Sequence, residues 1–209
     1  MQSNAWARDW RYSLIHGRQD QRRIPAAARD FLVSFGLPRV VMFEWRSDFE
    51  ISFTPVEKEL VPYNTTFTWG DFYNEARDRA WSHQLVIGEE EFCNGHASIC
   101  IHEHEGSVNR LDCELDKDAE CFVNSDVERY GKSLLFAQNW SVAVHANGAL
   151  PSVAALETLA SELRRVDPRA FEDQSNFWPN LFECVLENPD GDPLDLEITS
   201  DPARSKPRF

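Results

Sequence analysis

The feature that most constrains the fold is a series of short strand-like segments with connections too short to contain a helix. Four such segments follow one another, at Leu85–Ile87, Ala97–Glu103, Ser107–Asp112 and Glu120–Val123. The longest of the connections between them, residues 88–96, has nine residues. A crossover between parallel strands needs about a dozen or more. The pattern therefore predicts an antiparallel meander, with a hairpin around the turn His104-Glu105-Gly106.

Further elements are expected before this region. Pro25 suits the first position of a helix that would run to Phe35, and Gly36 suits the left-handed residue that ends one. Val40–Trp45 and Phe49–Phe53 are rich in β-branched and aromatic residues and are expected as strands. Trp69–His83 is ambiguous, and we interpret it as a helix.

Three helices are expected after the meander. The longest would span Asp126–Ala146, with Ser125 as its cap and Glu128 completing a capping box. A helix this apolar is expected to lie buried against the sheet. The other two are expected at Val153–Val166 and Pro179–Glu187.

These elements predict an α+β fold, in which an antiparallel sheet packs against several helices. Residues 1–187 are expected to form a single domain, and residues 188–209 an acidic, proline-rich tail that is partly mobile. The 209 residues include 14 Phe, 7 Trp and 4 Tyr, which supply the bulk of a core. A wholly disordered chain is therefore excluded.

Charge is unevenly distributed along the chain. The net charge of −14 and a pI near 4.8 exclude direct binding to nucleic acid. Residues 89–128 contain twelve acidic residues against two basic ones, a net charge of −10. This segment is either a well-solvated surface or one that steers a basic partner. The candidate binding residues are Glu89, Glu90, Glu91, Asp112, Glu114, Asp116, Asp118 and Glu120.

The chain is expected to be a soluble, cytoplasmic protein. Met1–Ile15 contains no continuous apolar stretch, and no run anywhere is long enough to span a membrane. The five cysteines are an odd number without a CxxC pair, which favours reduced thiols over a disulfide framework. No membrane partner is expected.

One set of side chains resembles a metal site, and comprises Cys93, His96, Cys100, His102 and His104. Thiolates and imidazoles are good zinc ligands. In an extended strand, however, Cys100 and His104 would lie about 13 Å apart, too far for one ion. We therefore predict no metal and interpret these histidines as polar residues on a strand face. A metal-dependent enzyme that uses His96, His102 and His104 remains an alternative.

Other signatures of catalysis are missing from the sequence. It contains neither the G-x-S-x-G motif of serine hydrolases nor the glycine-rich loops that bind phosphate. The alternating carboxylates after Asp112 lack the glycine and terminal glutamate of an EF-hand. We predict that the chain is not an enzyme and needs no cofactor.

Several motifs follow one another in a characteristic order, namely Ile24-Pro25, Phe31–Pro38, Leu85–Gly88, Ser98–His102, Gly106–Val108, Leu111-Asp112, Phe122–Ser125, Val166–Pro168 and Phe177-Trp178. This order, over about Trp6 to Glu187, resembles that of the SUKH immunity proteins, and of the SUKH-4 subfamily in particular. The chain departs from the family pattern at Glu103–Glu105, where its hairpin is unusually acidic and rich in histidine.

The resemblance implies a SUKH-like α+β fold and a non-catalytic protein that binds and neutralises a cognate toxin, often a nuclease or deaminase. The acidic candidates would then occupy the toxin's basic cleft as phosphate mimics. Motif residues with an expected structural role are Gly36, Leu37, Pro38, Gly88, Gly106, Asn124 and Ser125. The alternative is a cytosolic interaction scaffold of the same superfamily without a toxin partner.

Overall fold

The computed structural model describes residues 23–46, 49–56, 60–63, 79–92, 95–112, 119–145 and 152–187. The expected tail 188–209 lies outside these residues, as does most of the helix expected at Trp69–His83. Four candidate site residues also lie outside them: Cys93, Glu114, Asp116 and Asp118.

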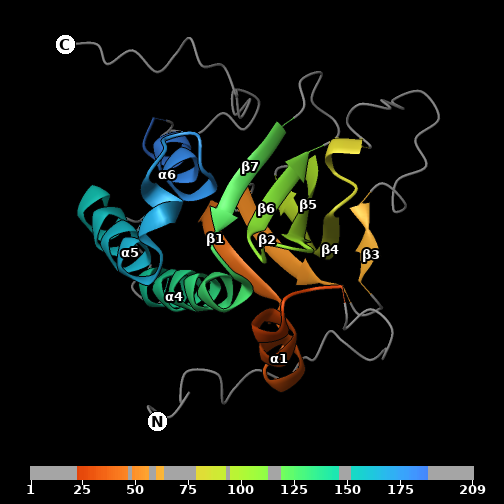
Figure 1. Cartoon of the computed structure of the whole chain (residues 1–209). Coiled ribbons are helices and arrows are strands. Elements are labelled where there is room, and N and C mark those ends of the chain that lie inside the picture. Colours follow the sequence, from red (N-terminus) through yellow and green to blue (C-terminus); the bar gives the residue numbers. More distant parts are fainter. Residues whose placement is uncertain are drawn as a thin grey trace.

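Seven strands of the described residues form one antiparallel sheet (Figure 1). They are β1 (Val40–Arg46), β2 (Phe49–Pro55), β3 (Val61–Pro62), β4 (Gln84–Phe92), β5 (Gly95–His102), β6 (Val108–Asp112) and β7 (Ala119–Asn124). The spatial order is β1-β2-β4-β5-β6-β7, and β3 pairs with β4. Because neighbours from β4 onward are also consecutive in the chain, the predicted antiparallel meander is confirmed.

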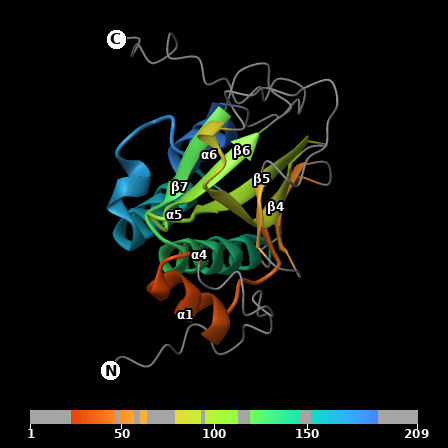
Figure 2. The ribbon, with the colours of Figure 1, turned by 45° about the vertical axis from the view of Figure 1, so that its right-hand side comes forward.

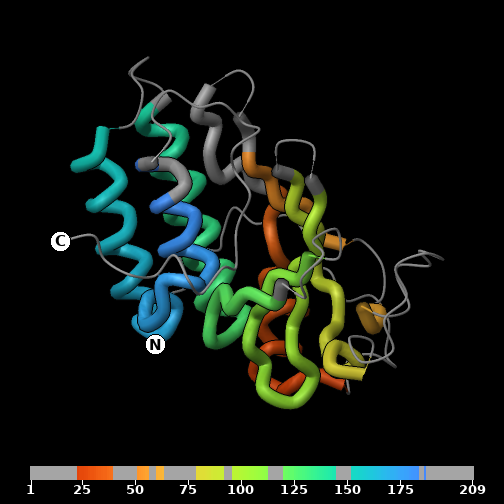
Figure 3. The backbone as a smooth tube through the Cα atoms, turned by 90° about the horizontal axis from the view of Figure 1, so that it is seen from above, coloured from red at the N-terminus to blue at the C-terminus, as the bar shows by residue number. Residues whose placement is uncertain are grey.

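The helices give the molecule a second layer. They are α1 (Ala26–Ser34), α4 (Val127–His145), α5 (Val153–Val166) and α6 (Phe177–Glu187), with the short 3-10 helix η3 (Pro168–Phe171) between the last two. Seen from above, α4, α5 and α6 form a layer beside the sheet (Figure 3). Helix α1 packs beside α4 (Figure 2). The predicted α+β arrangement is therefore confirmed.

The main core lies between α4 and the sheet. Helix α4 buries Tyr130, Leu134 and Ala137 on one face, and the Tyr130 ring meets Phe53 of β2 edge-on at 5.4 Å between centroids. Trp178 of α6 fills the same core and is fully buried. Among the described residues, none of the helices has the length and apolar character that crossing a bilayer requires.

The predicted cap of α4 is wrong by one residue. The carboxylate of Asp126 accepts the backbone N–H of Arg129 at 2.7 Å, which makes Asp126 the capping side chain. Glu128 forms no capping box but pairs with Lys132 at 2.8 Å. Ser125 instead donates its hydroxyl to Asp167, because that buried carboxylate is a strong acceptor within reach.

Two glycines of the family motifs have a visible structural role. Gly36 follows α1 with φ of 70°, the left-handed conformation that was expected at this helix end. Gly88 of β4 lies against β2, and a Cβ added to it would stand 2.2 Å from the Phe53 ring. A side chain at position 88 would therefore displace a core aromatic ring.

Candidate functional site

A β-bulge in β4 decides which way its three glutamates point. Leu85 and Ile87 both face the core, so strict alternation would turn Glu89 inward as well. The β4–β5 register shifts between Val86 and Gly88, however, and the extra residue reverses the alternation beyond it. Glu89 and Glu91 are consequently exposed, whereas Glu90 is buried.

A row of paired residues places Glu89 and Glu120 on one face of the sheet. Glu89 pairs with Ser98, Ser98 with Leu111, and Leu111 with Glu120, across four neighbouring strands. Directly paired residues have their side chains on the same face. Ile99, next to Ser98, belongs to the core beneath the helices, so this row lies on the opposite face. We call Glu89, Glu91 and Glu120 the outer acidic face.

Glu120 is held in place by two donors. Its carboxylate accepts the indole N–H of Trp81 at 3.2 Å and the amide N–H of Gln84 at 2.9 Å. Beneath these contacts, a small apolar cluster contains Tyr63, Trp81, Val86, Cys100 and Leu111. The charge of Glu120 therefore has a fixed position on a packed surface.

Two predicted binding residues, Glu90 and Asp112, lie around a buried cation instead. Glu90 is 2% exposed and accepts Arg110 Nε at 2.7 Å, and Arg110 Nη1 lies 3.4 Å from Asp112. Burial alone would lower the pKa of Arg110, but Glu90 and Asp112 outweigh it, and the pKa is raised. These two carboxylates therefore neutralise an internal charge.

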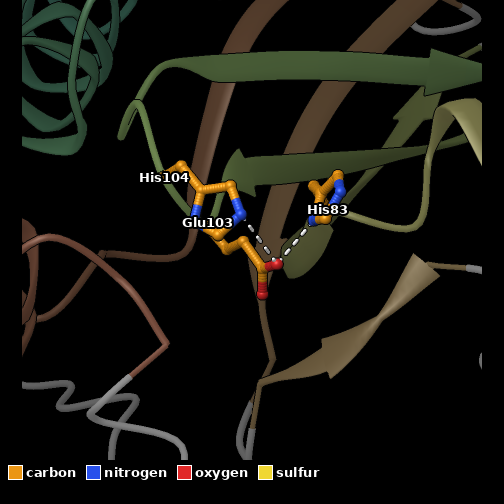
Figure 4. Close-up of side chains that lie close together, drawn as sticks. All are labelled: His83, Glu103 and His104. Atoms are coloured by element: carbon orange, nitrogen blue, oxygen red, sulfur yellow. Dashed lines mark hydrogen bonds and ion pairs between the residues drawn. The ribbon is translucent and has the colours of Figure 1, made fainter.

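A second cluster of titratable groups lies at the other end of β5. Glu103 Oε1 is 2.6 Å from His83 Nδ1 and 3.4 Å from His104 Nε2 (Figure 4). Its other oxygen, Oε2, accepts Arg23 Nη2 at 3.0 Å and Arg23 Nε at 3.2 Å. The pKa of Glu103 is lowered: its hydrogen bond with His83 has the largest effect, desolvation opposes it, and the hydrogen bond and charge of Arg23 lower the pKa further.

The structure does not assemble the metal-ligand set considered from the sequence. His96 and His102 are six residues apart along β5, about 20 Å in an extended strand, and Cys100 is buried in the apolar cluster. His83 was not among the candidates. The register that pairs Gln84 with His102 brings His83 opposite Glu103. The contact between His83 and Glu103 therefore becomes visible only once the strand pairing is known.

Motif residues from distant parts of the sequence meet in one buried polar network. Asp167 accepts the Asn124 side-chain N–H at 3.1 Å and both the backbone N–H and the hydroxyl of Ser125. The Trp178 indole N–H donates to Asn124 Oδ1 at 3.2 Å. Asn124, Asp167 and Trp178 are all buried, so this network joins β7 to α5 and α6.

Comparison with known protein families identifies a relationship. A family model described as SUKH-4 immunity protein matches residues 17–184. These residues include every strand described above and extend into α6. Neither the curated proteins nor the solved structures provide a match to the chain.

Proposed function

The chain belongs to the SUKH-4 immunity protein family, and on that premise we propose that it binds and neutralises a cognate toxin without catalysing a reaction itself. The toxin would be a nuclease or a deaminase with a basic substrate cleft. Its contact surface on this chain would be the outer acidic face, Glu89, Glu91 and Glu120. The encounter takes place in the cytoplasm, where such a toxin meets nucleic acid.

The observation that carries this proposal is the grouping of exposed carboxylates on the sheet face opposite helices α4, α5 and α6. Glu89 on β4 and Glu120 on β7 are separated by three strand spacings, about 14 Å. A cleft that binds nucleic acid must be rich in Lys and Arg. Carboxylates at fixed positions attract such a cleft, speed the encounter and set its register.

The attachment of Glu120 supports the same proposal. Because Trp81 and Gln84 already hold its carboxylate, binding orders no further rotatable bonds there. Glu90 and Asp112 are not part of the proposed surface, since both carboxylates pair with the buried Arg110 side chain. Glu114, Asp116 and Asp118 lie outside the described residues and stay candidates for the same contact from the sequence alone.

The first experiment is co-expression with the C-terminal domain of the protein encoded immediately upstream. If that domain is toxic, we expect this chain to restore growth and to co-purify with it as a 1:1 complex. Toxicity without rescue would contradict the immunity role and favour a scaffold that has no toxin partner.

The binding surface is tested separately by charge reversal. We expect the double variant Glu89→Lys/Glu91→Lys to weaken toxin binding by roughly tenfold or more in calorimetry at low salt. The matched control is Glu157→Lys/Glu172→Lys, which reverses two exposed charges on the helical side. Equal affinities for both variants would show that the outer acidic face is not the contact, even if neutralisation stands.

A further inference from the structure

Three side chains at one end of the sheet direct ligand atoms toward a common point. His83, Glu103 and His104 each offer one ligand atom, and these three atoms all lie within 4.8 Å of one another (Figure 4). His83 precedes β4, whereas Glu103 and His104 lie in the turn after β5. We propose that these residues bind one divalent transition-metal ion of the zinc class.

The distances fit such an ion. Zinc binds nitrogen and oxygen at about 2.0–2.1 Å, so two ligands of a tetrahedral ion stand about 3.3 Å apart. Glu103 Oε1 and His104 Nε2 are 3.4 Å apart. His83 Nδ1 and Glu103 Oε1 are closer, at 2.6 Å, because a hydrogen bond joins them. The His83 side chain is 49% exposed, so a small ring rotation opens this distance.

The carboxylate is held in position by its surroundings. Glu103 is 11% exposed, Arg23 holds its Oε2, and its backbone N–H donates to the His83 carbonyl at 2.8 Å. These contacts leave Oε1 facing the two imidazoles. Carboxylates that bind metal ions are commonly oriented by hydrogen bonds of this kind. The positive charge of Arg23 opposes the ion, so we expect binding weaker than at a closed structural zinc site.

His102 is near the site but is not a ligand. Its ring lies 5.9 Å from that of His104 and 6.0 Å from that of His83, between centroids. Its Nδ1 accepts the backbone N–H of Glu105 at 3.2 Å, so the neutral ring carries its proton on Nε2. That leaves no lone pair for a metal. With three protein ligands, the fourth position of the ion is taken by water.

The site is separate from the β4 part of the proposed toxin surface. Glu89 and Glu91 pair with Ser98 and His96 near the start of β5, whereas this cluster follows its end. A bound ion would tie the start of β4 to the β5–β6 turn. Only the folded state presents the site, and not the unfolded chain. A bound ion would therefore stabilise the folded state by mass action.

The test uses tag-free protein dialysed against a chelator, titrated with zinc chloride at pH 7.5 by calorimetry and melted with and without 200 µM zinc. We expect 1:1 binding and a rise in Tm of several degrees. His83→Ala and His104→Ala should each lose at least about tenfold in affinity and most of the Tm rise. His96→Ala and His102→Ala should keep both, and calcium or magnesium chloride should produce no shift.

The two histidine variants distinguish loss of a metal ligand from loss of the fold. They also reveal zinc that is bound by cysteine thiols elsewhere, because neither substitution would weaken such binding. His83 and His104 are 49% and 68% exposed, so their variants should melt close to wild type without metal. Either variant alone therefore decides the question. Absence of zinc binding in the wild type would overturn the proposal, as would equal binding by wild type, His83→Ala and His104→Ala.

Discussion

Asp167, at the end of α5, accepts both the backbone N–H and the hydroxyl of Ser125, at 2.6 and 2.9 Å, just before α4 begins. The carboxylate is 1% exposed, and Asn124 supplies a third donor. A buried charge is tolerated when it is hydrogen-bonded in this way. Asp167 therefore joins the β7–α4 connection to the corner after α5, and this contact spans 42 residues of sequence.

This network predicts a large effect for Asp167→Ala. The change removes an acceptor from three donors, of which the Asn124 N–H is buried and the two of Ser125 are half-buried, so we expect a loss of about 3 kcal/mol of unfolding free energy in urea denaturation. Ser152→Ala is the matched control, since Ser152 caps α5 through Ala155 N–H and should cost about 1 kcal/mol. Equal losses for the two variants would show that the network adds nothing beyond an ordinary cap.

The buried pair of Glu90 and Arg110 predicts that neighbouring glutamates differ sharply. Glu90→Gln leaves the Arg110 guanidinium buried with only Asp112 near it, so we expect destabilisation by about 3 kcal/mol. Glu89→Gln, at an exposed position, should stay within about 0.5 kcal/mol of wild type. Thermal or urea unfolding of the two variants compares them directly. If Glu90→Gln and Glu89→Gln have the same unfolding free energy, Glu90 is not buried beside Arg110 as described.

Gly88 predicts an overpacking effect. A methyl group there would lie 2.2 Å from Phe53 Cε2 and 2.9 Å from the Thr54 carbonyl oxygen, so Gly88→Ala should cost about 2–3 kcal/mol. Phe53→Leu removes part of the clash. In the Phe53→Leu background, we therefore expect the same glycine substitution to cost less, and a double-mutant cycle by urea denaturation measures the difference. Additive losses would mean that the ring does not limit position 88.

Elements whose signals are local were predictable from the sequence. The helix expected at Val153–Val166 has these same bounds in the structure, because Leu156, Leu159 and Leu163 repeat at helical spacing. Asp167-Pro168 then ends it. The antiparallel meander was equally predictable, since connection length alone excludes crossovers.

Features that depend on long-range pairing were not predictable. Nothing in the run Glu89-Glu90-Glu91 distinguishes its middle residue, and only the bulge before Gly88 turns Glu90 toward Arg110. His83 reaches Glu103 through the β4–β5 register. Ser125 looks like a helix cap until Asp167 is brought beside it by the packing of α5. In each case a partner distant in sequence decides the role of the residue.

Cys121 predicts a pH dependence of stability. Burial above all raises the pKa of its thiol from 9.0 to about 12, and its Sγ lies 3.2 Å from the Ser175 carbonyl oxygen as a donor. In the unfolded chain the thiol loses its proton near pH 9, whereas the folded chain retains it. This contribution to stability is therefore fully present below pH 9 and is lost as the pH rises toward 12.

Urea denaturation between pH 8 and 10.5 measures this effect as the difference between wild type and Cys121→Ala. We expect the advantage of the wild type to shrink as the pH rises, because only the unfolded wild type gains a thiolate at position 121. Alkylation gives an independent measurement: iodoacetamide at pH 8 should leave Cys121 unmodified in the native protein and modify it in urea. Rapid native modification at this residue would mean that its thiol is neither buried nor held protonated.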